Sequence, residues 1–253
     1  MKNRLQWDRQ LYRKKHNTKR FRFFNTIVEQ SDIHIGVTPS LYSEEIKNTA
    51  LNEIKKTRKL LGAYFKQFPD FLTALEPIQC IKNDPSEIKK MKKASLKASV
   101  GPMATVAGLT AEIVGKKLFS KYPPEEIVVE NGGDIWLKVK ESVAVEIFAG
   151  ESPLSSKLKL KIPPEKTPLG ICTSSATVGH SLSMGKADAA VISCSDTSLA
   201  DAFATSVCNM VKKPEDIEQA KNYIGQHKEI LSAVIIIGDK IFVSGSFDIL
   251  PVT

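Results

Sequence analysis

The stretch GICTSSATVGHSLSMGKADAAVISCSDTSLADAFATSVCNM, residues 170–210, decides how the chain is interpreted. It predicts a strand, a polar loop of small residues, a second apolar strand and a helix that begins near Ser198. Helix faces elsewhere in the chain are crowded with Lys and Glu, whereas this helix carries no long charged side chain before Lys212. We therefore expect the helix to be enclosed on all sides.

Two polar side chains of this helix, Asp201 and Thr205, are four residues apart and share one face. An enclosed carboxylate needs a partner, because an unpaired buried charge is costly. A divalent cation held by the Asp and Thr oxygens would supply one. The alternative is a satisfied helix cap, for which Ser198 and Asp201 have the Ser-x-x-Asp spacing.

A turn with the sequence Asn131-Gly132-Gly133-Asp134 lies between two predicted strands. As a hairpin turn it needs no further role, because its residues accept positive φ angles. As a binding site, its glycines would let the backbone approach a phosphate or a sugar, and Asp134 would accept hydrogen bonds from hydroxyl groups. Both interpretations stay open.

The loop after residue 172 is rich in hydroxyl groups and ends on a lysine, which suits phosphate binding. Its candidate ligand-binding residues are Thr173, Ser174, Ser175 and Lys186. His180 is a candidate general base, with a structural hydrogen-bond donor as the alternative. The stretch Gly-His-Ser-Leu-Ser does not match the nucleophile elbow Gly-x-Ser-x-Gly, because position 183 is Ser and not Gly. A serine hydrolase is therefore weakly supported.

Outside this stretch, strands and helices alternate without a repeat or a linker. Hairpin strands are expected over residues 20–37 and 231–247, helices over 43–68, 85–98, after Gly101 and after Pro214, and a β-meander over 126–162. The lysines of the helix over 85–98 spread around it, which indicates exposure. Antiparallel hairpins at both ends favour the α+β class.

The net charge of +8 is concentrated at the N-terminus. Residues 1–22 hold nine Lys or Arg and one acid, so the remainder is formally neutral. We expect a basic arm over residues 1–19 and a single domain over 20–253. The arm could bind nucleic acid or anionic lipid, or be a solvated segment whose aromatics pack on the body; the body itself is not expected to bind nucleic acid.

The rest of the composition is that of a globular protein. No run of about 18 apolar residues predicts a transmembrane helix, and no apolar segment follows the basic start as in a secretory signal. We expect a cytoplasmic protein. Its four cysteines form no Cys-x-x-Cys pair, and Cys194 and Cys208 are expected to be small core residues.

The order of these elements resembles that of the ApbE superfamily, whose best-known members are FAD:protein FMN transferases. The elements are the helix after Gly101, the NGGD turn, the CTSS strand end and the LADAFAT helix. The resemblance covers about residues 95–211. It implies an α+β fold with mixed, mainly antiparallel sheets covered by helices. It also implies Mg²⁺ and FAD, FMN or a related nucleotide as ligands, with Asp201, Thr205 and the backbone carbonyl of Ala104 as metal ligands.

The chain departs from the transferases of that superfamily at three places, one of which is their glycine-rich Gly-Ala-Phe-Asp segment, missing here near residues 69–77. Their His-Ile-Ile-Asp-Pro-x-Thr-Gly segment is shortened here to GHSLSMGKAD, and the Lys of the Ala-Lys-Gly turn is replaced by Thr105. The first hypothesis is metal-assisted FMN or nucleotidyl transfer, with a protein acceptor and a homodimer as further expectations. The second is a non-catalytic flavin- or nucleotide-binding or sensor protein. The third is an interaction protein that uses the basic arm.

Overall fold

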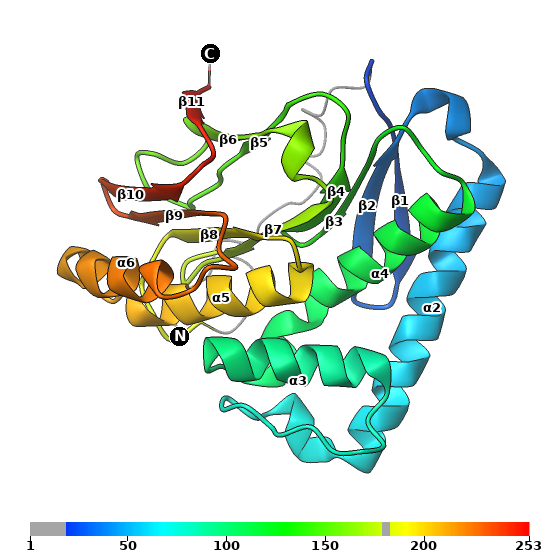
Figure 1. Ribbon diagram of the computed structural model, residues 1–253, viewed down its shortest axis with the longest axis horizontal. Coiled ribbons are helices and arrows are strands. Elements are labelled where there is room, and N and C mark those ends of the chain that lie inside the picture. The colour runs from blue at the N-terminus through cyan, green and yellow to red at the C-terminus, as the bar shows by residue number, and fades with distance from the viewer. Residues whose placement is uncertain (1–18, 179–182, 253) are drawn as a thin grey trace.

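The computed structural model describes residues 19–178 and 183–252, and within them the strands form an eight-stranded and a three-stranded sheet (Figure 1). All neighbouring strands are antiparallel. The large sheet has the order β1-β2-β3-β4-β7-β8-β9-β10, and the small sheet β11-β6-β5. The strands are β1 (Arg22–Val28), β2 (Ser31–Val37), β3 (Ile127–Asn131), β4 (Asp134–Lys138), β5 (Val143–Glu146), β6 (Leu158–Ile162), β7 (Leu169–Ser174), β8 (Ala189–Cys194), β9 (Ser232–Ile237), β10 (Lys240–Gly245) and β11 (Ile249–Pro251).

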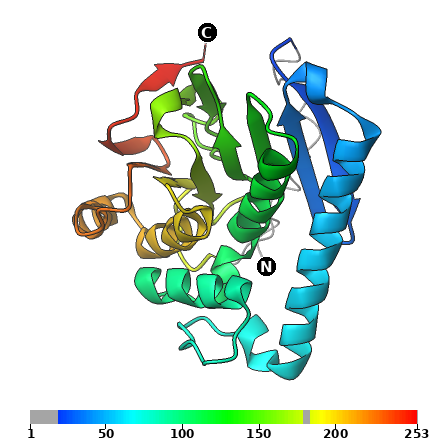
Figure 2. The same ribbon diagram turned by 45° about the vertical axis from the view of Figure 1, so that its right-hand side comes forward.

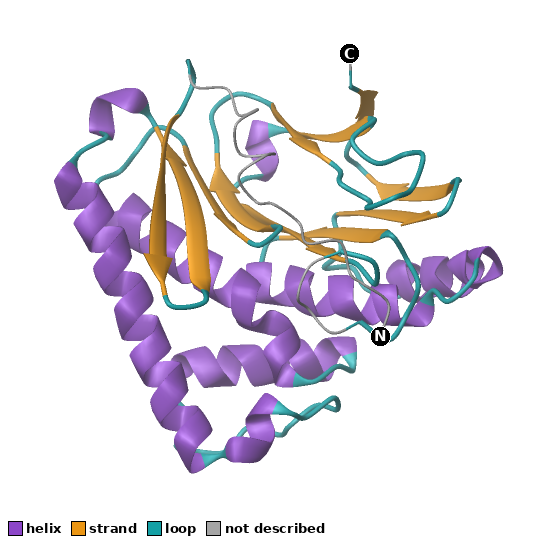
Figure 3. Cartoon of the chain, turned by 180° about the vertical axis from the view of Figure 1, so that it is seen from behind, coloured by secondary structure: helices purple, strands orange, loops and turns teal. Residues whose placement is uncertain are grey.

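Helices cover one face of the large sheet, and the small sheet covers part of the other (Figure 3). The α-helices are α2 (Glu44–Gln67), α3 (Ser86–Ala98), α4 (Val106–Lys121), α5 (Thr197–Met210) and α6 (Ile217–Gly225). The 3₁₀ helices are η1 (Pro39–Leu41), η2 (Pro69–Leu72), η3 (Pro102–Thr105), η4 (Pro164–Lys166) and η5 (Pro214–Asp216). α2 and α4 pack on β1 to β4, α5 and α6 pack on β7 to β9, and α3 lies outside α5 (Figure 2). The α+β class with mainly antiparallel sheets is confirmed.

The layers explain the composition of the central strands. β8 and β9 are buried at every residue, because α5 lies on one of their faces and the small sheet on the other. Such strands become continuous apolar runs instead of alternating ones. A Cβ on Gly170 would lie 2.4 Å from the Cα of Thr197, so the start of α5 can approach β7 this closely only above a glycine.

The predicted helix over residues 43–68 is confirmed as α2, and the Ser43 hydroxyl caps it by accepting a hydrogen bond from Ile46 N. The predicted meander over 126–162 is wrong in its pairing. β4 pairs with β7, not with β5, and β5 and β6 belong to the small sheet with β11. The sequence pattern shows where strands lie but not which ones pair, because pairing joins segments far apart in the chain.

Exposure of all the lysines of α3 was also predicted wrongly, because Lys92 is buried. Its Nζ lies 2.8 Å from Asp84 Oδ2, and the side chains are 3% and 0% exposed. Asp84 also accepts hydrogen bonds from the Tyr64 hydroxyl at 2.7 Å and from Ile81 N at 2.9 Å. This network ties the segment after η2 to α2 and α3, and the buried cation is tolerated because its carboxylate lies beside it.

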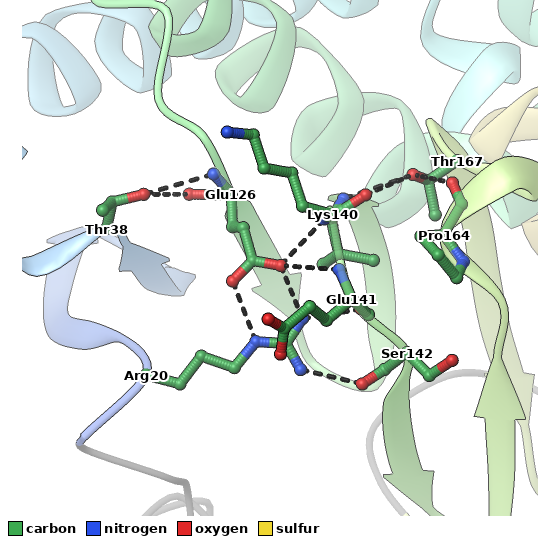
Figure 4. A network of polar contacts seen from close by, with 9 residues as sticks. Arg20, Thr38, Glu126, Lys140, Glu141, Ser142, Pro164 and Thr167 are labelled. Atoms are coloured by element: carbon green, nitrogen blue, oxygen red, sulfur yellow. Dashed lines mark hydrogen bonds and ion pairs between the residues drawn. The ribbon is translucent and has the colours of Figure 1, made fainter.

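Near the first described residues, Arg20 forms an ion pair with Glu126, the residue before β3 (Figure 4). Arg20 Nε donates to Glu126 Oε2 at 2.8 Å, and Glu126 Oε1 accepts from Lys140 N at 2.8 Å. The Arg20 hydrogen bonds lower the pKa of Glu126 to about 2, helped by backbone N–H groups and against its partial burial. The division into an arm over 1–19 and a domain over 20–253 stays a prediction, because nearly all of that arm lies outside the described residues.

No helix among the residues described here is long and apolar enough to cross a membrane. A cytoplasmic location and a homodimer stay predictions.

Candidate functional site

The β3–β4 hairpin turn places Asp134 at the start of β4. Gly132 and Gly133 have φ angles of 68° and 102°, in the left-handed region that favours glycine. Gly133 N donates to Glu130 Oε1 at 2.9 Å, and Asn131 Nδ2 donates to the carbonyl of Ala107 at 3.1 Å. The turn is therefore docked on the first turn of α4, and the Asn131 amide already has a protein partner there.

Asp134 is buried against β7. Its Oδ1 accepts a hydrogen bond from Thr173 N at 3.3 Å, and only 7% of the residue is exposed. Burial raises the pKa of Asp134 well above its usual range, and the negative charge of Asp201 raises it further. Burial and a neighbouring negative charge both disfavour the ionised form of Asp134, and a nearby cation would favour it.

Asp201 lies in the second turn of α5 and faces α4. Its Oδ2 accepts a hydrogen bond from Gly108 N at 2.9 Å, so the carboxylate satisfies part of the open amino end of α4. Burial raises the pKa of Asp201 to about 7, although the N–H groups of Gly108 and Ala107 oppose the shift. The expected enclosure of α5 is confirmed, since the residues along it are nearly all buried.

The cap of α5 differs from the predicted Ser-x-x-Asp pair. Asp196 is the N-cap residue, and its Oδ1 accepts from Leu199 N at 3.1 Å. Ser198 is fully buried, and its hydroxyl has no hydrogen-bond partner in the described part of the chain. Asp201 therefore does not cap its own helix, and its carboxylate instead accepts from the amino end of α4.

Asp134 lies near enough to Asp201 for the two carboxylate charges to interact, and no counter-ion separates them among the described residues. Among the described residues, neither carboxylate has a Lys, Arg or His partner. No group of three or more His, Cys, Asp and Glu side chains is arranged there to hold a metal. A cation at this place would therefore rest on two carboxylates and on neutral oxygens, which is the donor chemistry of Mg²⁺ or Ca²⁺.

The neutral donors named from the sequence lie on elements next to these carboxylates. Thr205 is one helical turn after Asp201 and is half-buried. Ala104 lies in η3, packs against the core that includes α5, and donates its N–H to Gly101 O at 3.1 Å. Their role as ligands stays a prediction.

The hydroxyl-rich loop has one end at this site. Thr173 N contacts Asp134, and the Ser174 hydroxyl is buried without a hydrogen-bond partner among the described residues. Ser175 Oγ accepts from Thr177 N and Val178 N at 3.1 and 3.0 Å, which folds the chain into a turn.

The other end of the loop is remote. Lys186 N donates to Val211 O at 2.7 Å, beyond the carboxyl end of α5. That end is roughly 15 Å from Asp201 along the helix at a rise of about 1.5 Å per residue. The Lys186 backbone is thus not brought to the carboxylates. His180 lies outside the described residues.

Sequence reasoning missed that Asp134 and Cys172 adjoin Asp201. The Cys172 thiol is buried, and its Sγ contacts Thr197 O at 3.4 Å. Burial and the charges of both carboxylates raise the pKa of Cys172, which keeps it a protonated thiol. The pairing of Ile135 with Ile171 creates this juxtaposition, and no local pattern indicates that pairing. Cys194 and Cys208 are buried core residues, as expected.

Comparison with known proteins identifies the family. Residues 13–232 match the family model described as "AbpE bacteria", and the chain belongs to this family. It is 42% identical over 195 residues to a UPF0280 protein of Methanocella arvoryzae, covering 77% of this chain and 79% of the relative. A UPF0280 protein of Methanocaldococcus jannaschii is 34% identical over 224 residues, covering 87% and 88%.

Two solved structures share the fold. The apo flavinyl transferase ApbE of Pseudomonas stutzeri aligns with a TM-score of 0.55 at 12% identity, over 88% of this chain and 93% of that one. The ApbE protein of Thermotoga maritima aligns with a TM-score of 0.54 at 14% identity, over 88% and 97%. The expected ApbE-like fold is therefore confirmed.

Proposed function

We propose that this protein binds a flavin or nucleotide phosphate together with a divalent cation, at the site between the β3–β4 turn, η3 and α5. The observation that carries the proposal is the pair of buried carboxylates, Asp134 and Asp201, which are near enough for their charges to interact and have no basic partner among the described residues. Two such groups cannot both stay ionised in the interior unless a cation joins them.

The residues present fit a hard cation. Asp201, the Thr205 hydroxyl and the Ala104 carbonyl would hold it, and we add Asp134 as a second carboxylate because of its position. Bound there, a divalent ion would neutralise charge on a phosphate group. The protein itself would contribute the hydroxyls of Ser174 and its neighbours, which are donors suited to phosphate oxygens.

The flavin part of the proposal comes from the family and the fold. The Pseudomonas stutzeri neighbour is named a flavinyl transferase. In FMN transfer, an acceptor hydroxyl oxygen bonds to the FMN phosphorus, the pyrophosphate bond breaks, AMP leaves and a base takes the hydroxyl proton. His180 is our candidate for that base. The acceptor would be a hydroxyl-bearing residue of a protein.

A second candidate function is a flavin or nucleotide sensor without transfer chemistry. The short segment GHSLSMGKAD, where transferases carry a longer His-containing one, favours it. Incubation with FAD, Mg²⁺ and a flavin-accepting protein, followed by in-gel fluorescence, separates the two. Acceptor fluorescence that disappears in His180→Ala supports transfer, and FAD binding without any acceptor fluorescence supports the sensor.

Binding is tested by titrating FAD, FMN and ADP with and without Mg²⁺. We expect Mg²⁺ to tighten binding of at least one of them in the unmodified protein. Asp201→Asn and Asp134→Asn should lose that effect, whereas Asp239→Asn, which changes an exposed carboxylate elsewhere, should keep it. Absence of binding by all three compounds would refute the proposal.

A further inference from the structure

Four lysines line a groove between α3 and the start of α5, on the outer side of that helix. The groove has a volume of about 450 Å³. Its lining residues are Ser86, Lys89, Lys90, Lys93, Ala94, Lys97, Asp196 and Leu199. It is separate from the carboxylate site, because Asp196 and Leu199 line it whereas Asp201 faces α4.

Two of the four lysines are neutralised by carboxylates. Lys90 Nζ lies 2.6 Å from Glu112 Oε1 and 3.1 Å from Asp196 Oδ2. Lys97 pairs with Glu229 at the surface. These two cations therefore contribute little net charge to the groove unless an anion displaces their partners.

The other two lysines, Lys89 and Lys93, have no carboxylate partner among the described residues. Lys89 Nζ donates to the carbonyl of Lys82 at 3.0 Å, which is a neutral acceptor. Lys93 is exposed and has no carboxylate partner in the part of the chain that the structure describes. The groove is thus electropositive although the chain beyond residue 22 is formally neutral.

The charged residues are spaced along one helix face. Lys89, Lys93 and Lys97 recur every fourth residue, so their stems follow one another at about 6 Å along α3. Like charges at this spacing destabilise a helix by repulsion. The buried residues between them, such as Ala94, supply the packing of α3, so the lysine row is not needed for the core.

We infer that this groove binds the phosphate chain of a small molecule. Lysine ammonium groups are compact charges that suit phosphate oxygens. The volume falls within the range of small-ligand sites. Among the described residues no aromatic side chain lines the groove, so they offer a base or a flavin ring no stacking surface and the phosphates are the recognised part. The inference does not depend on the proposed function.

The test uses the full chain, EDTA to remove divalent metal, and sodium tripolyphosphate as the probe in calorimetric titrations at about 0.1 M salt. The double variant Lys89→Gln and Lys93→Gln removes the unpaired charges. The double variant Lys66→Gln and Lys117→Gln removes the same charge from exposed positions on α2 and α4 and is the matched control.

We expect tripolyphosphate to bind the unmodified protein and the control equally, and the groove variant at least about tenfold more weakly, since each ionic hydrogen bond contributes on the order of a factor of ten. Equal affinities for tripolyphosphate and ATP would identify a free phosphate chain as the ligand. Tighter ATP binding would identify a nucleotide tail. Either result supports phosphate recognition.

Three results would overturn the inference. The first is that tripolyphosphate fails to bind, or that it binds all variants with the same affinity, as it would if it bound the basic residues of the N-terminal arm. The second is that Asp201→Asn abolishes tripolyphosphate binding, which would place the phosphates at the carboxylate site. The third is that a glutamate-rich peptide or single-stranded DNA displaces tripolyphosphate from the groove at a lower concentration than ATP does, which would indicate a macromolecular partner.

Discussion

Asp201 of α5 accepts a hydrogen bond from the backbone N–H of Gly108, at 2.9 Å, and so joins the middle of one buried helix to the first turn of another. A Cβ on Gly108 would lie 2.6 Å from Thr197 O and 3.0 Å from Asp201 Cβ. The two helices can therefore meet at this distance only through a glycine. The Asp201 carboxylate held by this contact is also near enough to Asp134 for the two charges to interact.

Gly108→Ala should destabilise the protein by about 2 kcal/mol, because the added methyl group forces α4 and α5 apart. Gly62→Ala is the control, since a Cβ at this α2 position meets nothing within 4 Å. It should stabilise the protein by roughly 0.5–1 kcal/mol through helix propensity. Urea unfolding monitored by circular dichroism measures both. Equal effects of the two substitutions would contradict the tight contact.

Thr205→Val should reduce the rise in melting temperature that Mg²⁺ produces, because it removes the hydroxyl but keeps the shape of the side chain. Thr205→Ser should keep most of that rise. Ligand-linked stabilisation grows with the logarithm of ligand concentration over its dissociation constant, so a Mg²⁺ titration of the melting temperature separates affinity from fold stability. Valine and serine variants with the same Mg²⁺ response would exclude Thr205 as a ligand.

Acid should destabilise the protein through Glu126. The Arg20 hydrogen bonds lower its pKa from 4.5 to about 2. A carboxyl group whose pKa falls on folding stabilises the folded state above its unfolded pKa, and that stabilisation is lost as the pH falls from about 4.5 toward 2.

Glu126→Gln should therefore cost about 1–2 kcal/mol at pH 7, roughly the size expected for hydrogen bonds to a charged group. It should also flatten the stability profile between pH 4.5 and about 2. Glu125→Gln is the matched control, because that neighbour is 65% exposed and pairs with Lys140 at 3.3 Å. It should change stability by less than about 0.5 kcal/mol. The measurement is the urea unfolding midpoint of both variants across this pH range. A Glu126 variant that follows the Glu125 variant at every pH would contradict the prediction.

Lys92→Met should destabilise the protein by about 3 kcal/mol, because it leaves the Asp84 charge buried without a cation. Lys93→Met, on the exposed face of the same helix, should change stability by less than about 0.5 kcal/mol. Thermal unfolding of both variants is the measurement. A Lys92 variant as stable as the Lys93 variant would mean that the Tyr64 hydroxyl and Ile81 N alone hold the Asp84 carboxylate.

Local chemistry was enough to predict most elements. Ser43 and the apolar spacing that follows it predicted α2, and the small, uncharged residues around Asp201 predicted an enclosed helix. The buried place of Lys92 was not predicted, because its partner Asp84 lies in an irregular segment whose path depends on packing. Ser198 was predicted as the cap in place of Asp196, because both residue types favour a helix start.

The candidate site divides in the same way. The sequence by itself determined that Asp201 and Thr205 share a helix face and that Gly132 and Gly133 form a turn, because helical spacing and positive φ angles are local properties. Only the tertiary structure decided that β4 pairs with β7 and that Gly108 admits α5, and these two contacts bring Asp134 and Cys172 to Asp201. Sheet pairing and helix contact join residues far apart in the chain, and the free energy that selects them comes from burying the whole core.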